Sequence, residues 1–434
     1  MRPARRWTAV LAALALLGVV AAFRPAAAML WHVAAVVIAV VGVVDGVRVS
    51  WGTPLKVSRR IHHYLAVDRW VEVRLTVTNH TSGRFTGEVF DLLPPCCQWR
   101  GLPAVVQLDP GEMATVCYHA RPCRRGEWQF RGVEVLRHSP WRLWKRLERV
   151  DVCDTVRVYP DYVAVMNYAL LARTNQLGVL GVRRRPRRGE GMAFHQLREY
   201  RSGDTLRQID WKATASHRRL ISREYQEERD QTVVFLLDCS ARMRAHDPGV
   251  VHFDQVLKSM LLLAYVALRQ GDSVGMMTFG GWSRWLAPRK GQSTVTELLN
   301  NIYDVHASNH AADYLQAARQ LHQRQRKRAL VVLLTNTRDD DEGDLVAALE
   351  LLSRRHFVLF ANLREVSLDT LRECPIHTLD DGLTYLAAEQ FLWRRHCTHE
   401  TILKSGVSVL DVTAARLPIA VVNRYLDIKK GGRL

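Results

Sequence analysis

Two long apolar runs at the start of the chain constrain its fold more than any other feature. Residues 7–23 carry no charge, and residues 26–44, which follow an Arg-Pro pair, are apolar apart from one histidine. A helix of about 20 apolar residues crosses the hydrocarbon core of a bilayer. We therefore predict two transmembrane helices within residues 1–50, joined by a tight turn.

Basic residues gather at the outer ends of these runs. Arg24 is the one basic residue in the turn, whereas the outer ends carry Arg2, Arg5, Arg6, Arg48, Lys56, Arg59 and Arg60. Because basic flanks are retained in the cytoplasm, this asymmetry predicts that both chain ends and the soluble domains are cytoplasmic. A signal peptide cleaved after Ala28, followed by a single anchor, stays open as an alternative because residues 26–28 are all alanine.

The length and charge of the chain limit the domains that can come after the anchor. At roughly 150 residues per domain, 434 residues allow two or three domains. The net charge of +18 favours anionic partners such as lipid headgroups or acidic protein surfaces. Eight cysteines without a C-x-x-C pair indicate neither a disulfide scaffold nor a zinc ribbon.

Residues 60–160 have the pattern of a β domain. Apolar and polar residues alternate through residues 71–78, and turn residues such as Pro94-Pro95 and Asp109-Pro110-Gly111 separate further short apolar segments. Short strands at this spacing predict a small β-sandwich of immunoglobulin type.

Residues 165–230 form a basic connector. Its run RRRPRR at residues 183–188 is either a solvated loop or a contact for anionic lipids. Nucleic-acid binding is not expected, because no aromatic residues are interleaved with these arginines.

A dense alternation of charged and aromatic residues ends the connector. It consists of Arg198, Tyr200, Gly203, Asp204, Arg207, Asp210, Trp211 and Lys212. We expect a structural lattice in which the arginines pair with Asp204 and Asp210 while Trp211 supplies an apolar anchor. The string resembles the signature of the "domain of unknown function 58" family of bacterial membrane proteins. That resemblance implies that the protein lies in the bacterial inner membrane and acts together with a MoxR-type AAA+ ATPase.

Residues 231–430 alternate between apolar strands and amphipathic helices. The apolar run at residues 232–237 ends in Asp238, and a later run at residues 330–334 ends before Thr335. This alternation predicts a doubly wound α/β domain, whose ligands bind at the carboxyl ends of the strands. Asp238 and Thr335 are therefore expected at its site.

The segment after the first of these strands resembles the metal-site loop Asp-x-Ser-x-Ser of von Willebrand factor A domains. Asp238 and Ser240 are kept, but Arg242 replaces the last serine, and Asn336 stands where the family has an aspartate, with Asp339 close behind. We expect Arg242 to take the place of the cation, so that no cofactor is bound. Two alternatives stay open. Asp238 and Ser240 could form an atypical magnesium site, or Asp238 could cap the turn that follows its strand.

The sequence contains neither a P-loop nor a His-Glu-x-x-His motif. No catalytic residue is assigned, and we expect a multi-domain, membrane-anchored adaptor for a MoxR-type AAA+ ATPase. Its partner-binding residues are expected to be Asp238, Ser240, Arg242, Asn336 and Asp339. An envelope hydrolase and a membrane-tethered nucleic-acid binder are the alternatives.

Overall fold

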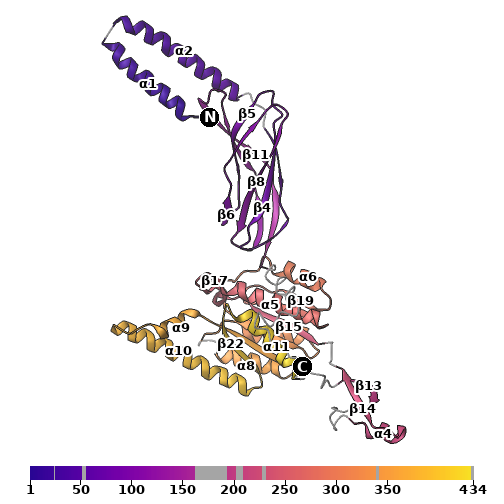
Figure 1. Ribbon diagram of the computed structural model, residues 1–434. Helices are drawn as coiled ribbons and strands as arrows, with labels where there is room; N and C mark the ends of the chain where they lie inside the picture. Colours follow the sequence, from indigo (N-terminus) through magenta and orange to yellow (C-terminus); the bar gives the residue numbers. More distant parts are fainter. Residues whose placement is uncertain are drawn as a thin grey trace. The chain divides into compact units, whose positions relative to one another are not determined.

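The computed structural model describes residues 1–23, 25–50, 55–161, 193–201, 209–226, 231–338 and 342–431. They form two compact units, Met1–Tyr159 and Pro160–Leu434. Figure 1 shows an α-helical hairpin and a β-rich region in the first unit and a mixed α/β sheet in the second.

The first unit begins with the predicted pair of apolar helices. Helix α1 spans Arg5–Ala22 and helix α2 spans Pro25–Ser50, and both are long and apolar enough to cross a membrane. Side chains such as Leu16, Leu17 and Val36 are more than half exposed. Apolar surface of this extent on a helix pair fits a lipid environment and supports membrane anchoring.

The β-rich region, which we call the β domain, contains three sheets around one core. Their strand orders are β1-β11-β10-β5-β7, β2-β4-β8-β6 and β3-β12-β9. The bounds are β1 Arg2–Pro3, β2 Lys56–Arg60, β3 Tyr64–Ala66, β4 Val71–Thr78, β5 Phe85–Asp91, β6 Cys97–Arg100, β7 Ala104–Leu108, β8 Met113–Pro122, β9 Gly126–Phe130, β10 Val133–His138, β11 Trp144–Val150 and β12 Asp154–Tyr159. Along β4 the alternation has the expected result, since Val73, Leu75 and Val77 are fully buried.

A buried ion pair lies in the core of the β domain. The guanidinium of Arg59 donates to both carboxylate oxygens of Asp91, at 2.9 and 2.6 Å, and to Asp154 at 2.7 Å. The hydroxyl of Tyr118 donates to Asp91 at 2.5 Å. A buried charge is tolerated only when it is paired and hydrogen-bonded in this way.

The chain before α1 also belongs to the β domain, which the sequence did not predict. Strand β1 pairs with β11, and the Trp144 indole donates to the Gly42 carbonyl of α2 at 2.8 Å. Asp45 in α2 is completely buried and accepts backbone N–H groups of Trp141 and Leu143, at 3.2 and 3.4 Å. Both ends of the helical hairpin are therefore fastened to one edge of the β domain.

The second unit contains a sheet in the order β19-β18-β15-β20-β21-β22, parallel except for β19. The strands are β15 Thr232–Asp238, β18 Ser273–Phe279, β19 Trp285–Arg289, β20 Leu330–Thr335, β21 Phe357–Arg364 and β22 Ser408–Thr413. Helices α5 His252–Arg269, α6 Ser293–Ile302 and α11 Leu417–Lys430 cover one face. Helices α7 Tyr314–Arg324, α8 Glu342–Ser353 and α10 Leu379–Lys404 cover the other, and α9 Val366–Glu373 packs beside α10. The predicted helices on both faces of a mostly parallel sheet are confirmed.

The described part of the basic connector is a small α/β element. Strands β13 (Ala193–Glu199) and β14 (Ile221–Gln226) pair antiparallel, and helix α4 (Trp211–His217) lies between them in the chain. The arginine run at residues 183–188 lies outside the described residues.

Candidate functional site

The candidate site lies where the strand order of the α/β sheet reverses. Strand β15 is flanked by β18 on one side and β20 on the other, so the connections leave β15 and β20 toward opposite faces of the sheet. Ligands of doubly wound sheets bind at this point, outside the carboxyl ends of the strands. Asp238 is the last residue of β15 and Thr335 the last of β20, as the sequence predicts.

A closed hydrogen-bond network joins these two strand ends. Asp238 is fully buried, and one of its carboxylate oxygens accepts the Ser240 backbone N–H at 2.8 Å. The other accepts the Thr335 hydroxyl at 2.6 Å. The Tyr314 hydroxyl lies 2.9 Å from that of Thr335 and 3.4 Å from the same carboxylate oxygen. Both oxygens of Asp238 are thus hydrogen-bonded by groups of this chain.

Tyr314 is a site residue that the sequence analysis missed. It is the first residue of α7, which Asp313 caps by accepting the Gln316 backbone N–H at 2.7 Å. Its ring packs edge-on against Phe279 with 5.6 Å between centroids. The cap at Asp313 is the sequence signal that could have placed residue 314 at this edge, because a helix before a parallel strand starts at the carboxyl edge.

The loop after Asp238 is held by close backbone contacts. The Ala241 N–H donates to the His310 carbonyl at 2.9 Å, and the Ser308 N–H donates to the Cys239 carbonyl at 2.7 Å. Gly280 has a φ of +77°, and a Cβ there would lie 2.8 Å from the Ser240 nitrogen. Glycine is therefore required at position 280, and the loop has little room to rearrange.

Charge at the site comes from Asp238 and Arg242. Burial raises the pKa of Asp238, whereas the hydrogen bonds from Thr335 and Ser240 and the positive charge of Arg242 act to lower it. Arg242 lies in the short 3-10 helix η3 (Ala241–Arg244) directly after Ser240. The charge of Arg242 acts on the pKa of Asp238 in the direction in which a bound cation would act, but it is the smallest of these effects, and burial dominates.

The described residues at this site do not fit a divalent cation. Magnesium requires about six oxygen ligands in octahedral geometry. Asp238, Thr335 and Tyr314 are hydrogen-bonded to one another, and Arg242 adds a positive charge beside them. The Ser240 hydroxyl is the one oxygen of this set without a hydrogen bond to a described residue. Asp339, the remaining predicted partner-binding residue, lies outside the described part of the chain.

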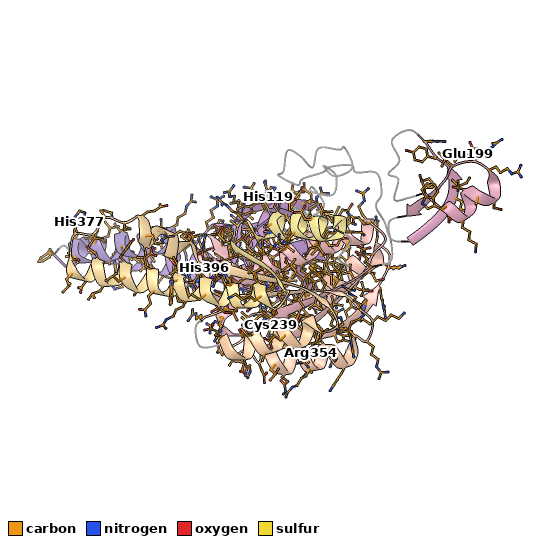
Figure 2. All side chains as sticks on the ribbon, turned by 90° about the horizontal axis from the view of Figure 1, so that it is seen from below. His119, Glu199, Cys239, Arg354, His377 and His396 are labelled. Atoms are coloured by element: carbon orange, nitrogen blue, oxygen red, sulfur yellow. The ribbon has the colours of Figure 1, made fainter. Side chains whose placement is uncertain are left out.

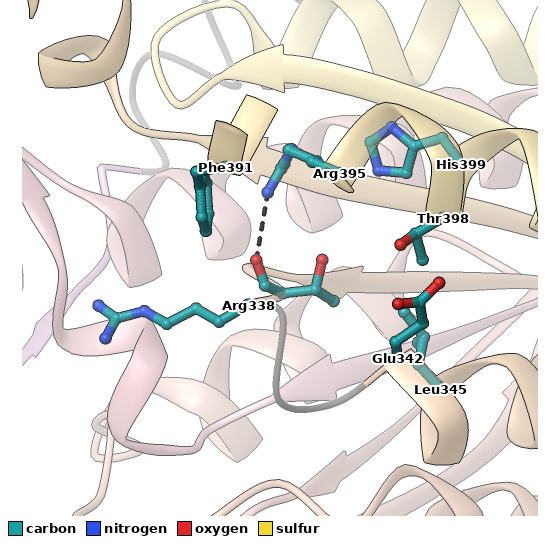
Figure 3. Close-up of a pocket in the computed structure, with 8 residues that line it drawn as sticks. Arg338, Glu342, Leu345, Phe391, Arg395, Thr398 and His399 are labelled. Atoms are coloured by element: carbon teal, nitrogen blue, oxygen red, sulfur yellow. Dashed lines mark hydrogen bonds between the residues drawn. The ribbon is translucent and has the colours of Figure 1, made fainter. Parts of the chain in front are cut away.

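A second polar cluster continues the edge toward β21 and β22. Asn336 donates to Glu365 at 3.4 Å, and the Asn362 amide lies 3.0 Å from the His399 ring. Arg395 of α10 donates to the Thr337 carbonyl at 3.2 Å and forms an ion pair with Asp411 at 2.9 Å. Figure 3 shows Arg395 and His399 of α10 lining a small pocket together with Arg338 and Glu342. Burial lowers the pKa of His399 to about 4, so its imidazole is neutral at pH 7.

The signature residues of the connector form a local structure. Asp210 caps α4 by accepting the backbone N–H groups of Lys212 and Ala213, both at 3.0 Å. Arg219 pairs with Glu199 at 2.8 Å between the end of β13 and the start of β14. The indole of Trp211 is 67% exposed, so it does not act as the apolar anchor that we expected.

The first part of the signature is only partly described. Tyr200 donates its backbone N–H to the Leu220 carbonyl at 2.9 Å. The Arg198 side chain is not described, and Gly203, Asp204 and Arg207 lie outside the described residues. The expected ion-pair lattice between the arginines and Asp204 therefore stays a prediction.

Comparison with known proteins identifies the family of this segment. Residues 196–382 match the family described as "Protein of unknown function DUF58", which confirms the resemblance found in the sequence. "Uncharacterized protein YeaD" of Bacillus subtilis is 24% identical over 199 residues, which are 46% of this chain and 47% of that protein. The chain thus matches about half the length of this relative.

Two solved structures are similar to parts of the chain. An aerotolerance-related membrane protein from Bacteroides fragilis is 18% identical with a TM-score of 0.29, covering 45% of this chain and 98% of its own. The PapD-like domain 7 of human CEP192 is 17% identical with a TM-score of 0.18, covering 24% of this chain and 84% of its own.

Proposed function

We propose that this DUF58-family chain is a membrane-anchored, cytoplasm-facing adaptor rather than an enzyme. Its α/β domain is of von Willebrand factor A type and binds a partner protein at the carboxyl edge of the sheet that Asp238, Ser240, Arg242, Asn336 and Asp339 form. The buried Asp238, Ser240 and Asn336 hold the loops of this edge, and Arg242 faces the partner. The partner is a MoxR-type AAA+ ATPase, and the pair acts in the assembly or maturation of other proteins. The identity of the ATPase comes from the family resemblance.

The sheet topology supports the von Willebrand factor A assignment. If its six strands are numbered in chain order, the sheet reads 3-2-1-4-5-6, and the third strand is the antiparallel one at the edge. A doubly wound sheet of this order has its ligand crevice between strands 1 and 4. Those strands are β15 and β20, which carry Asp238 and Thr335.

The observation that carries the proposal is the closed network around Asp238. General acid–base or nucleophilic chemistry needs a side chain that is free to exchange a proton with a substrate. The Asp238 carboxylate and the hydroxyls of Thr335 and Tyr314 are instead bonded to one another in the interior. Arg242, which is partly buried, brings a guanidinium to this edge, and a guanidinium can receive a partner's carboxylate with two parallel hydrogen bonds.

The attachment of the hairpin supports the proposed orientation. Strand β1, before α1, and the end of α2 both contact strand β11 of the β domain. The two ends of the hairpin therefore lie on the same side of the membrane as the β domain. Because the basic residues flank these ends, that side is the cytoplasm by the positive-inside rule.

Affinity capture tests the proposal. The detergent-solubilised chain, immobilised in buffer with EDTA, should retain a MoxR-type ATPase from a membrane-free lysate, identified by mass spectrometry. Arg242→Glu should lower the retained amount at least tenfold, because it places a like charge against an acidic partner residue. Arg354→Glu, an equal charge change at an exposed position after α8, is the matched control and should retain the wild-type amount. Equal capture by the two variants would show that the interface lies elsewhere.

A further inference from the structure

Helix α10 has apolar residues on two opposite faces. Its inward face is buried and includes Ala388 and Ile402, which are 6% and 0% exposed. Its outward face carries Leu379, Leu383, Leu386 and Trp393, which are between 56% and 81% exposed. Residues 386 and 388 differ by about 200° around a helix, so these are opposite sides of the same cylinder.

The outward residues form a stripe on one face of α10, in which the exposed Gln390 separates Leu386 from Trp393. They follow one another at intervals of four, three and seven residues, the spacing of one face of a helix that packs against another helix. The stripe extends over about 21 Å at a rise of 1.5 Å per residue. Figure 2 shows His377, just before α10, at the far tip of the arm formed by α9 and α10, and His396 nearer the sheet. An amphipathic surface helix leaves its outer face polar, so this stripe is a candidate for burial by a partner.

The charges along α10 indicate which partner fits. The first half carries the exposed acids Asp380 and Asp381, with Glu389 paired to Arg372 at 2.6 Å. The second half carries Arg394, His396 and Lys404, and its one acid, Glu400, faces His396 at 3.4 Å. An acidic first half and a basic second half complement a copy of the same helix in the antiparallel direction and repel one in the parallel direction.

We propose that the outward face of α10 binds a second copy of this chain as an antiparallel helix pair centred on Leu386. At this centre Leu386 packs against its own copy, and Leu379 packs against Trp393 of the partner subunit. Asp380 then lies within one helical turn of the basic residues near position 394 of the other copy. A two-fold pair of this kind is self-complementary and closed, as most homodimers are. This inference does not depend on the proposed ATPase partner.

Sedimentation equilibrium of the full chain in density-matched detergent tests the proposal. The wild type should have the mass of a dimer. Leu383→Asp combined with Leu386→Asp should have the mass of a monomer at the same concentration. The control Thr384→Asp adds a charge at an exposed α10 position that lies about 200° around the helix from Leu386, away from the stripe, and should stay dimeric. A monomeric wild type, or a double variant that stays dimeric, would overturn the proposal.

Charge reversal tests the antiparallel direction without changing any apolar contact. Asp380→Lys alone should weaken the dimer at least tenfold, and so should Arg394→Glu alone. Mixing the two variants should restore a mixed dimer, because each interface end then pairs a lysine with a glutamate or an aspartate with an arginine. Circular dichroism of each variant checks that α10 is still folded. Failure of the mixture to associate, with both variants folded, would contradict the antiparallel pair, and capture of a different protein by the stripe would replace it.

Discussion

Asp238→Ala separates a structural role for this carboxylate from a role as a cation ligand. The substitution removes the acceptor of the Ser240 N–H and of the Thr335 hydroxyl, at 2.8 and 2.6 Å. A buried donor left without an acceptor costs about 1–3 kcal/mol. The Thr335 hydroxyl can turn toward Tyr314, 2.9 Å away, so one lost bond is partly replaced. We therefore expect a loss of about 2–4 kcal/mol from the stability of the α/β domain.

Two milder substitutions set a scale for this loss. Asp238→Asn keeps one acceptor oxygen and should cost about 1–2 kcal/mol, whereas Tyr314→Phe removes a single neutral hydroxyl and should cost about 1 kcal/mol. The predicted order of destabilisation is Asp238→Ala, then Asp238→Asn, then Tyr314→Phe.

Hydrogen exchange of the full chain, measured by mass spectrometry, gives a direct readout. Peptides over β15 and β20 report the free energy of opening the sheet. A loss of about 2–4 kcal/mol corresponds to a fall in protection of roughly 30-fold to 700-fold, since 1.4 kcal/mol is about a factor of ten. The structural role predicts the same fall with EDTA as with magnesium. If protection in EDTA is unchanged, while magnesium protects the wild type and not Asp238→Ala, then Asp238 is a cation ligand and the reasoning fails.

Three further predictions concern other parts of the chain. Asp91→Ala should destabilise the β domain by about 3–5 kcal/mol, because it leaves the Arg59 guanidinium buried without its main partner. Asp154→Ala removes a partly exposed carboxylate and should cost less than half as much, and urea unfolding measures both losses. Burial lowers the pKa of His399 to about 4. The contribution of the neutral imidazole to the free energy of unfolding is therefore complete above pH 6.5 and is lost as the pH falls toward 4, by at most about 1.4 kcal/mol per pH unit. His399→Gln should flatten the pH dependence of hydrogen-exchange protection in β21. Mass spectrometry of the purified chain should find the intact N-terminus, and a mature chain beginning after Ala28 would contradict the attachment of β1 to β11.

The sequence predicts the elements of the site better than its contacts. Asp238 and Thr335 are identified because each ends an apolar strand, and topology then brings their side chains within 2.6 Å. Tyr314 is not identified, because its hydroxyl reaches the site from a helix that starts 76 residues later in the chain. A long-range contact of this kind leaves no periodic trace in a single sequence.

In the helical hairpin, too, the sequence predicts the elements but not their long-range contacts. Its apolar runs predict both helices, yet α2 continues through Asp45 to Ser50, beyond the apolar run that ends at residue 44. Asp45 lies at the end of that run because the β domain supplies its hydrogen-bond donors. The outward apolar stripe of α10 is hidden for another reason, since apolar residues on both faces cancel the one-sided pattern that reveals an amphipathic helix.

Site-specific photo-crosslinking in intact membranes tests the proposed partner interface most directly. A photo-reactive residue would replace Ala311, which is exposed in the loop beside Ala241 at the carboxyl edge of the sheet. Arg354, after α8, and Val105, on strand β7 of the β domain, serve as comparison positions. An interface at the carboxyl edge predicts an adduct with a MoxR-type ATPase from position 311 and none from the other two. An adduct from position 105, with none from position 311, would contradict this proposal and move the partner interface to the β domain.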